Sequence, residues 1–358
     1  MRRRPRRTHA LATCATPIAV VAIALVGLSA CAEQVDDTEA AANEEYLLGM
    51  EYYQQGGSNL RQAIDHFTRS VDLDSTFALG YAGLARAHAS IGGQFNVLSP
   101  EQTFPKAKEA AEKAVALDDD LAEAHLAQAY VKELGEWDWT DAEREYQRAL
   151  ELDSANVEIL TSYAWFLVNT KRADEAAALV EKARDLAPAA WTATAQLDYL
   201  ITGNAVGPVQ MVKDFIEADP NNPAGYWWLG NIYTQEGDFE GAAEQLQKQI
   251  PLMEGDVVDE VALLGHVYGR MGREEDARRM LERLDELSDE GRYVSPVLKA
   301  WIHSGLGEAE EAVAWLREGY EARAHRSGLQ MNGFSFVYEP ISEDPSFVSL
   351  LEEMGLPR

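Results

Sequence analysis

The sequence predicts an all-α protein, a solenoid of about seven or eight stacked helix pairs that ends in a C-terminal capping segment. Small residues recur at spacings of 34 to 35 residues, as from Ala142 to Ala176 and from Ala277 to Ala312. In each first helix, a bulky side chain follows three positions after the small residue, except in one irregular unit. A fixed period of this length indicates a stack of similar helix pairs, because neither helix of a pair can bury its apolar face alone.

The composition limits the possible partners. The 358-residue chain is 46% hydrophobic and contains 8 tryptophans, which is typical of a folded chain with a core. Its formal net charge is -29, from 31 basic and 60 acidic residues. We expect no nucleic-acid partner, since phosphate binding needs clusters of Lys and Arg. The charge leaves two interpretations open: a basic protein partner, or an acidic surface that keeps an exposed helical protein soluble.

The N-terminus, residues 1–30, is predicted to be a signal peptide. The basic start MRRRPRRTHA precedes an apolar run centred on residues 18–26, and small residues follow at Leu28-Ser29-Ala30. The apolar run is too short to predict a membrane-spanning helix. An ordinary signal peptide, cut at a neighbouring small residue, is the alternative to a lipoprotein signal.

The segment LSAC, which ends at Cys31, resembles the lipobox of bacterial lipoproteins. The resemblance implies cleavage after Ala30, lipidation of Cys31 and anchoring in the bacterial cell envelope. In Gram-negative lipoproteins, Asp directly after the cysteine would signal against transfer to the outer membrane. Ala32 stands at this position, so the resemblance further implies the outer membrane of a Gram-negative host, facing the periplasm. Residues 31–43 are acidic and lack apolar periodicity, so we expect a tether that spans at most about 40 Å.

The repeat array is predicted to span residues 44–324. Its most regular unit, at residues 157–190, is VEILTSYAWFLVNTKRADEAAALVEKARDLAPAA, two amphipathic helices joined by a polar turn and closed by Pro188. The small-residue column of the first helices consists of Gly49, Ala85, Ala127, Ala164, Gly230, Gly265 and Ala300. The columns of the second helices consist of Ala142, Ala176, Ala242, Ala277 and Ala312, and of Ala114, Ala149 and Ala183. Small residues are needed where two helices approach closely.

One stretch carries a family pattern. Residues 226–252, YWWLGNIYTQEGDFEGAAEQLQKQIPL, resemble a tetratricopeptide repeat in the order of an aromatic residue, Leu-Gly, Tyr, Gly-Asp-Phe, Ala and Leu. The resemblance implies a right-handed α-solenoid whose first helices line a concave groove, and it implies binding of proteins or peptides. Glycines are expected to end the first helices in the left-handed conformation, at Gly92, Gly135, Gly237, Gly272 and Gly307.

Three regions depart from the pattern. The second unit carries the insertion GGQFNVLSPEQTFPKA, which we expect to form a loop or short turn before a helix that starts at Lys106. The fifth unit lacks the small-residue columns and has Pro208 where its second helix should begin, so it marks either a bend or simple sequence drift. The tail, residues 325–358, should end in a capped helix that covers the last repeat with Phe347, Leu350, Leu351 and Met354.

Motifs for catalysis and metal binding are absent from the sequence. It contains no GxxxxGK[ST], HExxH, CxxC or GxSxG, and its histidines are scattered. His88 and His303 fall in the column that packs helices together. We therefore expect no enzyme activity, no cofactor and no metal site.

Binding is the remaining prediction, with the first helices as the candidate surface. The groove-facing positions lie just after the small residue and three to four residues further on. They are Arg86, Gln128, Lys132, Trp165, Asn169, Trp227, Asn231, Gln235, His266, Arg270 and Trp301. Amide and guanidinium groups can hold a peptide backbone or a carboxylate, and tryptophan can cover apolar side chains. For each residue alone, an exposed or inter-helix role is the competing interpretation.

The sequence therefore favours a membrane-tethered scaffold that mediates protein-protein interactions in the assembly or regulation of an envelope complex. A glycan-binding or small-molecule-binding sensor is the main alternative, with tryptophans as stacking platforms. A hydrolase with a site formed across repeats is a third hypothesis.

Overall fold

The computed structural model describes residues 38–95, 97–187, 191–253, 257–324 and 335–353. These residues form helices, turns and connections, with no β-strand among them. The predicted signal peptide and the lipidation site at Cys31 lie outside the described residues. Within the described ranges, no helix is both long and apolar enough to cross a membrane.

Four helix pairs, units one to four, form the N-terminal half. A helix of residues 38–55 pairs with α2, and the other units pair α3 with α4, α5 with α6 and α7 with α8. Their bounds are α2 Leu60–Leu73, α3 Ala78–Gly93, α4 Pro100–Leu117, α5 Ala122–Tyr130, α6 Trp139–Leu152, α7 Val157–Asn169 and α8 Ala173–Leu186. A π-helical segment, η2 (Val131–Glu136), extends α5, and the 3₁₀ turn η1 (Gly57–Asn59) precedes α2.

Four more pairs, units five to eight, form the C-terminal half and are followed by the tail. Their bounds are α9 Trp191–Thr202, α10 Val206–Ala218, α11 Pro223–Glu236, α12 Phe239–Gln249, α13 Val258–Arg270, α14 Glu274–Asp289, α15 Pro296–Leu306 and α16 Ala309–Glu321. The short η3 (Ile250–Leu252) follows α12, and the tail contains the 3₁₀ segment η4 (Ser335–Ile341) and α18 (Pro345–Glu353). The described residues thus confirm the predicted all-α solenoid, with eight helix pairs.

The N-terminal boundary differs from the prediction. The first helix includes residues 38–43 of the expected tether, and Ala42 is fully buried. Its main-chain oxygen accepts a hydrogen bond of 2.7 Å from the Ser70 hydroxyl of α2. The sequence did not predict this part of the helix, because residues 41–43, Ala-Ala-Asn, include no large apolar side chain that would indicate an apolar face.

The predicted small-residue columns are where helices touch. Every alanine of the columns has an exposed fraction of 0%, in first and second helices alike. Glycine is required where the approach is closest: a Cβ on Gly49 or on Gly83 would lie 2.6 Å from the Phe67 ring. The period in the sequence therefore reports helix-helix packing, because only small side chains leave room for such close contacts.

The predicted helix ends are correct in three units and wrong in two. Gly237, Gly272 and Gly307 have φ of 78°, 70° and 76° and follow their helices in the left-handed conformation. Gly92 instead lies within α3 and Gly135 within η2. Both are glycines because α4 packs against them: a Cβ there would lie 2.0 Å from the Thr103 hydroxyl oxygen or 2.9 Å from the Phe104 ring.

The insertion in unit two also differs from the prediction. The helix α4 begins at Pro100 and continues through Pro105, so it starts before the expected Lys106. Proline is well suited to the first helical position, where its missing N–H would have no helical partner. The remaining loop is held by Arg61, whose guanidinium donates to the main-chain oxygen of Val97 over 3.2 Å.

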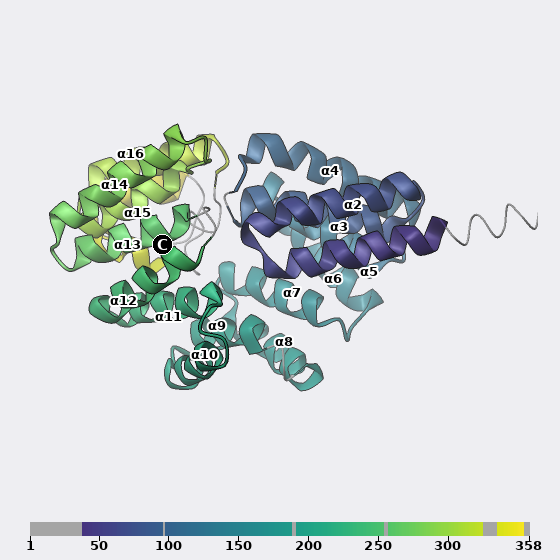
Figure 1. Ribbon diagram of the computed structural model, residues 1–358, viewed down its shortest axis with the longest axis horizontal. Helices are drawn as coiled ribbons and strands as arrows, with labels where there is room; N and C mark the ends of the chain where they lie inside the picture. The colour runs from purple at the N-terminus through teal and green to yellow at the C-terminus, as the bar shows by residue number, and fades with distance from the viewer. Residues whose placement is uncertain (1–37, 96, 188–190, 254–256, 325–334, 354–358) are drawn as a thin grey trace, which may run out of the picture.

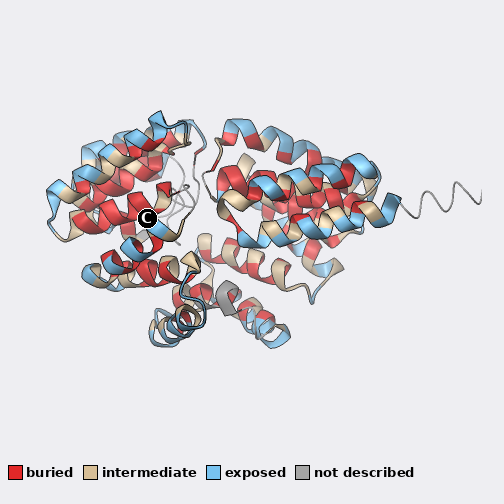
Figure 2. Cartoon of the chain, viewed as in Figure 1, coloured by how far each residue is buried: buried red, intermediate tan, exposed pale blue. Residues whose placement is uncertain are grey.

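The core is discontinuous at unit five. One apolar cluster ends with Leu197 of α9, and another begins with Ala242 of α12. Within α10, only Pro208 and Val212 are buried, and Val206 is 79% exposed. In Figure 1 the chain turns at α8–α11, and Figure 2 shows mostly exposed colour on α10. These observations favour the bend interpretation of this irregular unit.

Because of the bend, the two halves of the solenoid touch. The ring of Trp137, after η2, lies 5.4 Å from the ring of Tyr320 at the end of α16. The Arg323 guanidinium lies 5.3 Å from the Trp137 ring and donates to the main-chain oxygens of Gly135 and Glu136 over 3.3 and 3.1 Å. Trp137 and Arg323 both have positive φ, 57° and 49°. This contact closes the array upon itself between units three and eight.

Candidate functional site

The first helices of neighbouring units pack side by side, as α3 does on α5, α7 on α9 and α13 on α15. We call the surface formed by the predicted groove positions of these helices the first-helix face. It carries the eleven predicted binding residues, and the structure divides them into three groups with different surroundings.

In the N-terminal group, Arg86 lies inside the protein. Its exposed fraction is 1%, its guanidinium forms an ion pair with Glu158 of α7, and it lies 4.8 Å from the Tyr53 ring. Burial is the largest single influence and disfavours the charged form, but the Glu158 carboxylate and the neighbouring tyrosines together outweigh it, so the pKa of Arg86 is raised. A partner therefore cannot contact Arg86 in this state, which corrects the prediction of a groove-facing arginine.

The other N-terminal residues are more accessible. Gln128 is half-buried on α5, and Lys132 is half-buried on η2. The Lys132 ammonium lies 2.6 Å from the Glu136 carboxylate, which Lys108 of α4 also contacts at 2.6 Å. Glu136 is partly desolvated, which opposes ionisation, but the two lysines more than compensate and lower its pKa. Lys132 is thus engaged within the chain.

The middle group of the first-helix face lies on α7 and α11. Trp165 and Asn169 lie one turn apart on α7, and Trp227, Asn231 and Gln235 follow at the same spacing on α11. All are half-buried except Asn231, which is 1% exposed and donates from Nδ2 to the main-chain oxygen of Trp227 over 2.8 Å. Side chains four residues apart lie on one face of a helix, so each set forms a single row.

Two amide atoms in this row are buried without a hydrogen-bond partner among the described residues. They are Oδ1 of Asn231, an acceptor, and Nε2 of Gln235, a donor. Unpaired buried polar atoms are rare because each costs about 1–3 kcal/mol. Both atoms are enclosed by the protein, so a partner could reach them only after these side chains rotate.

In the C-terminal group, the predicted residues are covered. Trp301 is fully buried on α15, and His266 is fully buried on α13. The His266 Nδ1 donates to the main-chain oxygen of Trp301 over 3.0 Å, and burial lowers the pKa of His266 to about 4. Arg270 forms an ion pair of 2.8 Å with Glu339 of the tail. The prediction that His266 and Trp301 are available to a partner is therefore wrong for this state.

The sequence did not reveal the residues that cover both ends of this face. From the sequence alone, Glu158 in the first turn of α7 could equally be an acidic residue that stabilises the helix dipole. The tail residues Val337, Tyr338 and Ile341 are buried against the last units, yet they lie outside any repeat column. Only the apolar run Phe-Val-Tyr before Pro340 indicated a packed segment.

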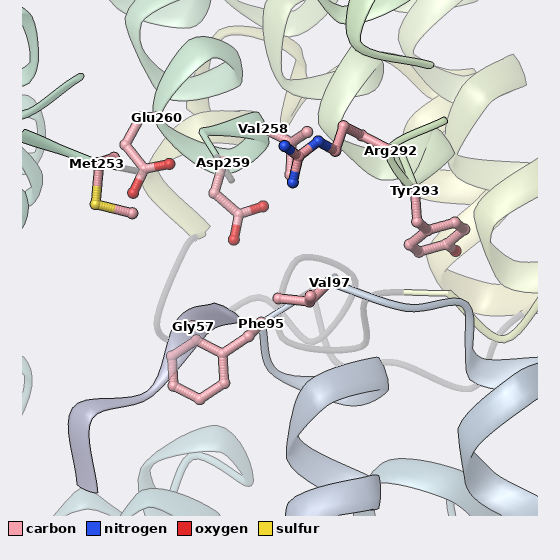
Figure 3. Close-up of a pocket in the computed structure, with 9 residues that line it drawn as sticks. All are labelled: Gly57, Phe95, Val97, Met253, Val258, Asp259, Glu260, Arg292 and Tyr293. Carbon is pink, nitrogen blue, oxygen red and sulfur yellow. The ribbon is translucent and has the colours of Figure 1, made fainter. Parts of the chain in front are cut away.

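A small pocket lies between the two halves (Figure 3). Its lining comes from Gly57, Phe95 and Val97 of the N-terminal half and from Met253, Val258, Asp259, Glu260, Arg292 and Tyr293 of the C-terminal half. Its volume is about 60 Å³, far below the roughly 300–1,000 Å³ of typical small-molecule sites. Among the described residues, no cluster of His, Cys, Asp or Glu could hold a metal ion.

Comparison with known proteins supports the repeat interpretation. Two tetratricopeptide-repeat family profiles match residues 133–197 and 210–251. A comparison with curated proteins gives no match.

Solved structures of repeat proteins are similar at low identity. The Cut9–Hcn1 assembly of the APC/C gives a TM-score of 0.53 at 14% identity, covering 82% of this chain and 52% of that chain. Yeast Tom70 gives 0.49 at 18% identity, covering 87% and 67% of the two chains. PilW, described as a type IV pilus biogenesis factor, gives 0.43 at 19% identity, covering 57% and 92%. The likeness to Cut9–Hcn1 concerns the fold alone. The profile matches and the packed small-residue columns show that the chain contains tetratricopeptide repeats, which supports a scaffold for protein-protein interactions.

Proposed function

We propose that this protein is a non-enzymatic scaffold, lipid-anchored at Cys31 in the bacterial cell envelope, that holds another envelope protein on its first-helix face. The basic, apolar and small-residue order of residues 1–31 supports the anchor, and Ala32 after the cysteine supports the outer-membrane location facing the periplasm. Residue 38 already belongs to the first helix, so the short connection from Cys31 would keep the solenoid close to the membrane.

The observation that carries the proposal is the row on α11. Trp227 is half-buried there, and it lies beside the unpaired Oδ1 of Asn231 and Nε2 of Gln235. Both amide atoms are enclosed in this state. Side-chain rotation would bring them to a bound peptide, whose main chain would satisfy them while the indole covered an apolar side chain. On α7, Trp165 and Asn169 repeat the spacing of Trp227 and Asn231.

The net charge of -29 supports a partner that is basic overall, since opposite charges accelerate encounter and suppress wrong partners. The pocket between the halves is too small to favour the glycan or small-molecule alternative.

The partner proposal is tested by cross-linking intact cells and identifying the captured envelope proteins. Trp227→Ala together with Gln235→Ala should remove the captured partner, whereas Trp228→Ala, the neighbouring tryptophan on the same helix, should retain it. Retention of the partner by the first variant, with an unchanged helical circular dichroism spectrum, would place the binding surface elsewhere. A melting temperature raised by peptidoglycan fragments, with no protein captured, would favour the sensor hypothesis.

The anchor is tested separately. Cys31→Ser should move the protein from the membrane fraction to the soluble fraction, because one lipid-modified residue provides the attachment. If the variant stays in the membrane fraction, the lipoprotein proposal is wrong, whatever the result for the partner.

A further inference from the structure

The chain's own tail occupies the C-terminal end of the first-helix face. In η4, Val337, Tyr338 and Ile341 have exposed fractions of 0%, 1% and 2%, and η4 packs on α15. The Trp301 indole Nε1 donates to the Tyr338 hydroxyl over 3.1 Å. The Ser304 hydroxyl, one turn further along α15, donates to the main-chain oxygen of Val337 over 2.5 Å.

An ion pair adds to the contacts between η4 and the first-helix face. The Arg270 guanidinium of α13 lies 2.8 Å from the Glu339 carboxylate and 4.7 Å from the Phe239 ring, which positions it. Two predicted groove residues, Arg270 and Trp301, and Ser304 beside them therefore contact three consecutive residues of one peptide segment.

Capping the solenoid explains the apolar part of these contacts, but not the polar part. The end of the array is covered by α18, which packs on α16 and buries Phe347, Leu350 and Leu351. The segment η4 shares this cap, since its Tyr338 ring lies 5.5 Å from the Phe347 ring and both belong to one apolar core. Unlike α18, η4 also forms hydrogen bonds with α15, on the face where the sequence predicted binding.

The contacts of η4 are also those by which proteins recognise peptides. Ser304 donates to a main-chain carbonyl, Trp301 donates to a tyrosine hydroxyl, and Arg270 forms an ion pair with a carboxylate. A covering segment that only excluded water would need apolar packing alone.

We propose that η4 is an intramolecular ligand that keeps this end of the first-helix face closed, and that the partner displaces it with a segment of the same chemistry: an aliphatic residue, a tyrosine and an acidic residue in succession. This inference rests on the proposed function and adds to it a recognition motif and a mode of regulation. Binding of a competing segment is strengthened when η4 is released, because the apparent affinity scales with the fraction of open molecules.

The test uses the full chain and a fluorescent peptide of sequence SFVYEPI, with fluorescence anisotropy as the readout. Glu339→Arg reverses the charge that faces Arg270, and Glu339 is exposed, so the variant should fold normally. We expect the peptide to bind this variant about threefold more tightly than wild type, because a surface ion pair holds η4 only weakly and the apparent affinity rises with the open fraction.

Three controls define the outcome. Glu343→Arg, an exposed acidic residue close to η4, should leave peptide binding as in wild type. The double variant Arg270→Glu with Glu339→Arg restores the ion pair with exchanged charges and should not bind the peptide more tightly than wild type. A peptide with alanine in place of tyrosine should not bind any form.

Tyr338→Ala provides a second, stronger release of the segment. If neither Tyr338→Ala nor Glu339→Arg binds the peptide more tightly than wild type, and both retain the wild-type circular dichroism spectrum, η4 is a fixed part of the fold and the inference is wrong. That result would not affect the proposed function, which depends on partner capture through Trp227 and Gln235.

Discussion

The two ends of the first-helix face are both closed, but by different means. At the N-terminal end, Arg86 and Glu158 close the surface from within the repeats, across units two and four. At the C-terminal end, η4 closes it from outside the repeats. The same repeat pattern thus has two outcomes. At the N-terminal end, side chains of the repeats fill the surface themselves. At the C-terminal end, a separate segment covers the surface.

The closures also differ in their electrostatics. The N-terminal one buries a charge that depends on its partner, because desolvation of an unpaired guanidinium is expensive. The C-terminal one buries neutral groups and leaves its ion pair at the surface, with the Glu339 side chain 66% exposed. Opening the second closure therefore requires no buried charge to lose its partner.

The largest difference is expected between two tryptophans of the first-helix face. Trp301→Ala should lower the free energy of unfolding of the C-terminal units by about 3–5 kcal/mol, because it leaves a cavity beneath η4. Trp165→Ala, at a half-buried position, should cost clearly less. Native-state hydrogen exchange measures both, and equal losses would contradict the distinction between the covered and the accessible part of the face.

The N-terminal ion pair should respond asymmetrically to removal of either partner. Glu158→Gln leaves the Arg86 charge buried without its carboxylate and should destabilise the N-terminal units by about 3 kcal/mol. Arg86→Met leaves a carboxylate whose side chain is 34% exposed and can be solvated, so its cost should be clearly smaller. Thermal unfolding of the two variants decides the matter, and a larger loss for Arg86→Met would refute this account of the closure.

Acid should weaken the C-terminal half through His266. Its folded-state pKa of about 4 lies below the unfolded value of about 6.5, so the unfolded chain binds more protons between these values. This histidine alone should reduce stability by about 2 kcal/mol from pH 7 to pH 5. His266→Asn, whose amide can still donate to the Trp301 carbonyl, should show a correspondingly shallower pH dependence of the melting temperature. An unchanged slope would show that His266 does not carry the effect.

The smallest expected effect concerns the contact between the halves. Arg323→Ala removes an exposed cation over the Trp137 ring and should cost only about 0.5–1 kcal/mol. Because this contact joins units three and eight, the variant should nevertheless increase the radius of gyration in X-ray scattering. Arg292→Ala in the neighbouring pocket is the comparison variant. An unchanged radius for Arg323→Ala would mean that the bend at unit five alone sets the shape.

The sequence was informative wherever one helix pair resembles the next. Ala85, Ala164 and Ala300 were predicted to be contact points from their spacing alone, and each is fully buried. Local turn chemistry was equally readable at Gly237 and Gly307, where a left-handed residue ends a helix. It failed at Gly92 and Gly135, because a glycine that admits a neighbouring helix looks the same in sequence as one that ends a helix.

The first-helix face shows where such reasoning stops. Position in the repeat predicted which residues lie on this face, but not whether anything covers them. Arg86 and Trp301 occupy equivalent positions after Ala85 and Ala300, and both are buried for reasons outside their own units.

By itself, the sequence determined the helical class, the repeat period and the residues at which helices touch, because these follow from side-chain size and spacing within one unit. Only the tertiary structure decided that the array bends at unit five, that Trp137 meets Arg323, and that η4 fills one end of the first-helix face. These contacts join residues far apart in the chain, and their geometry depends on small rotations that accumulate from unit to unit.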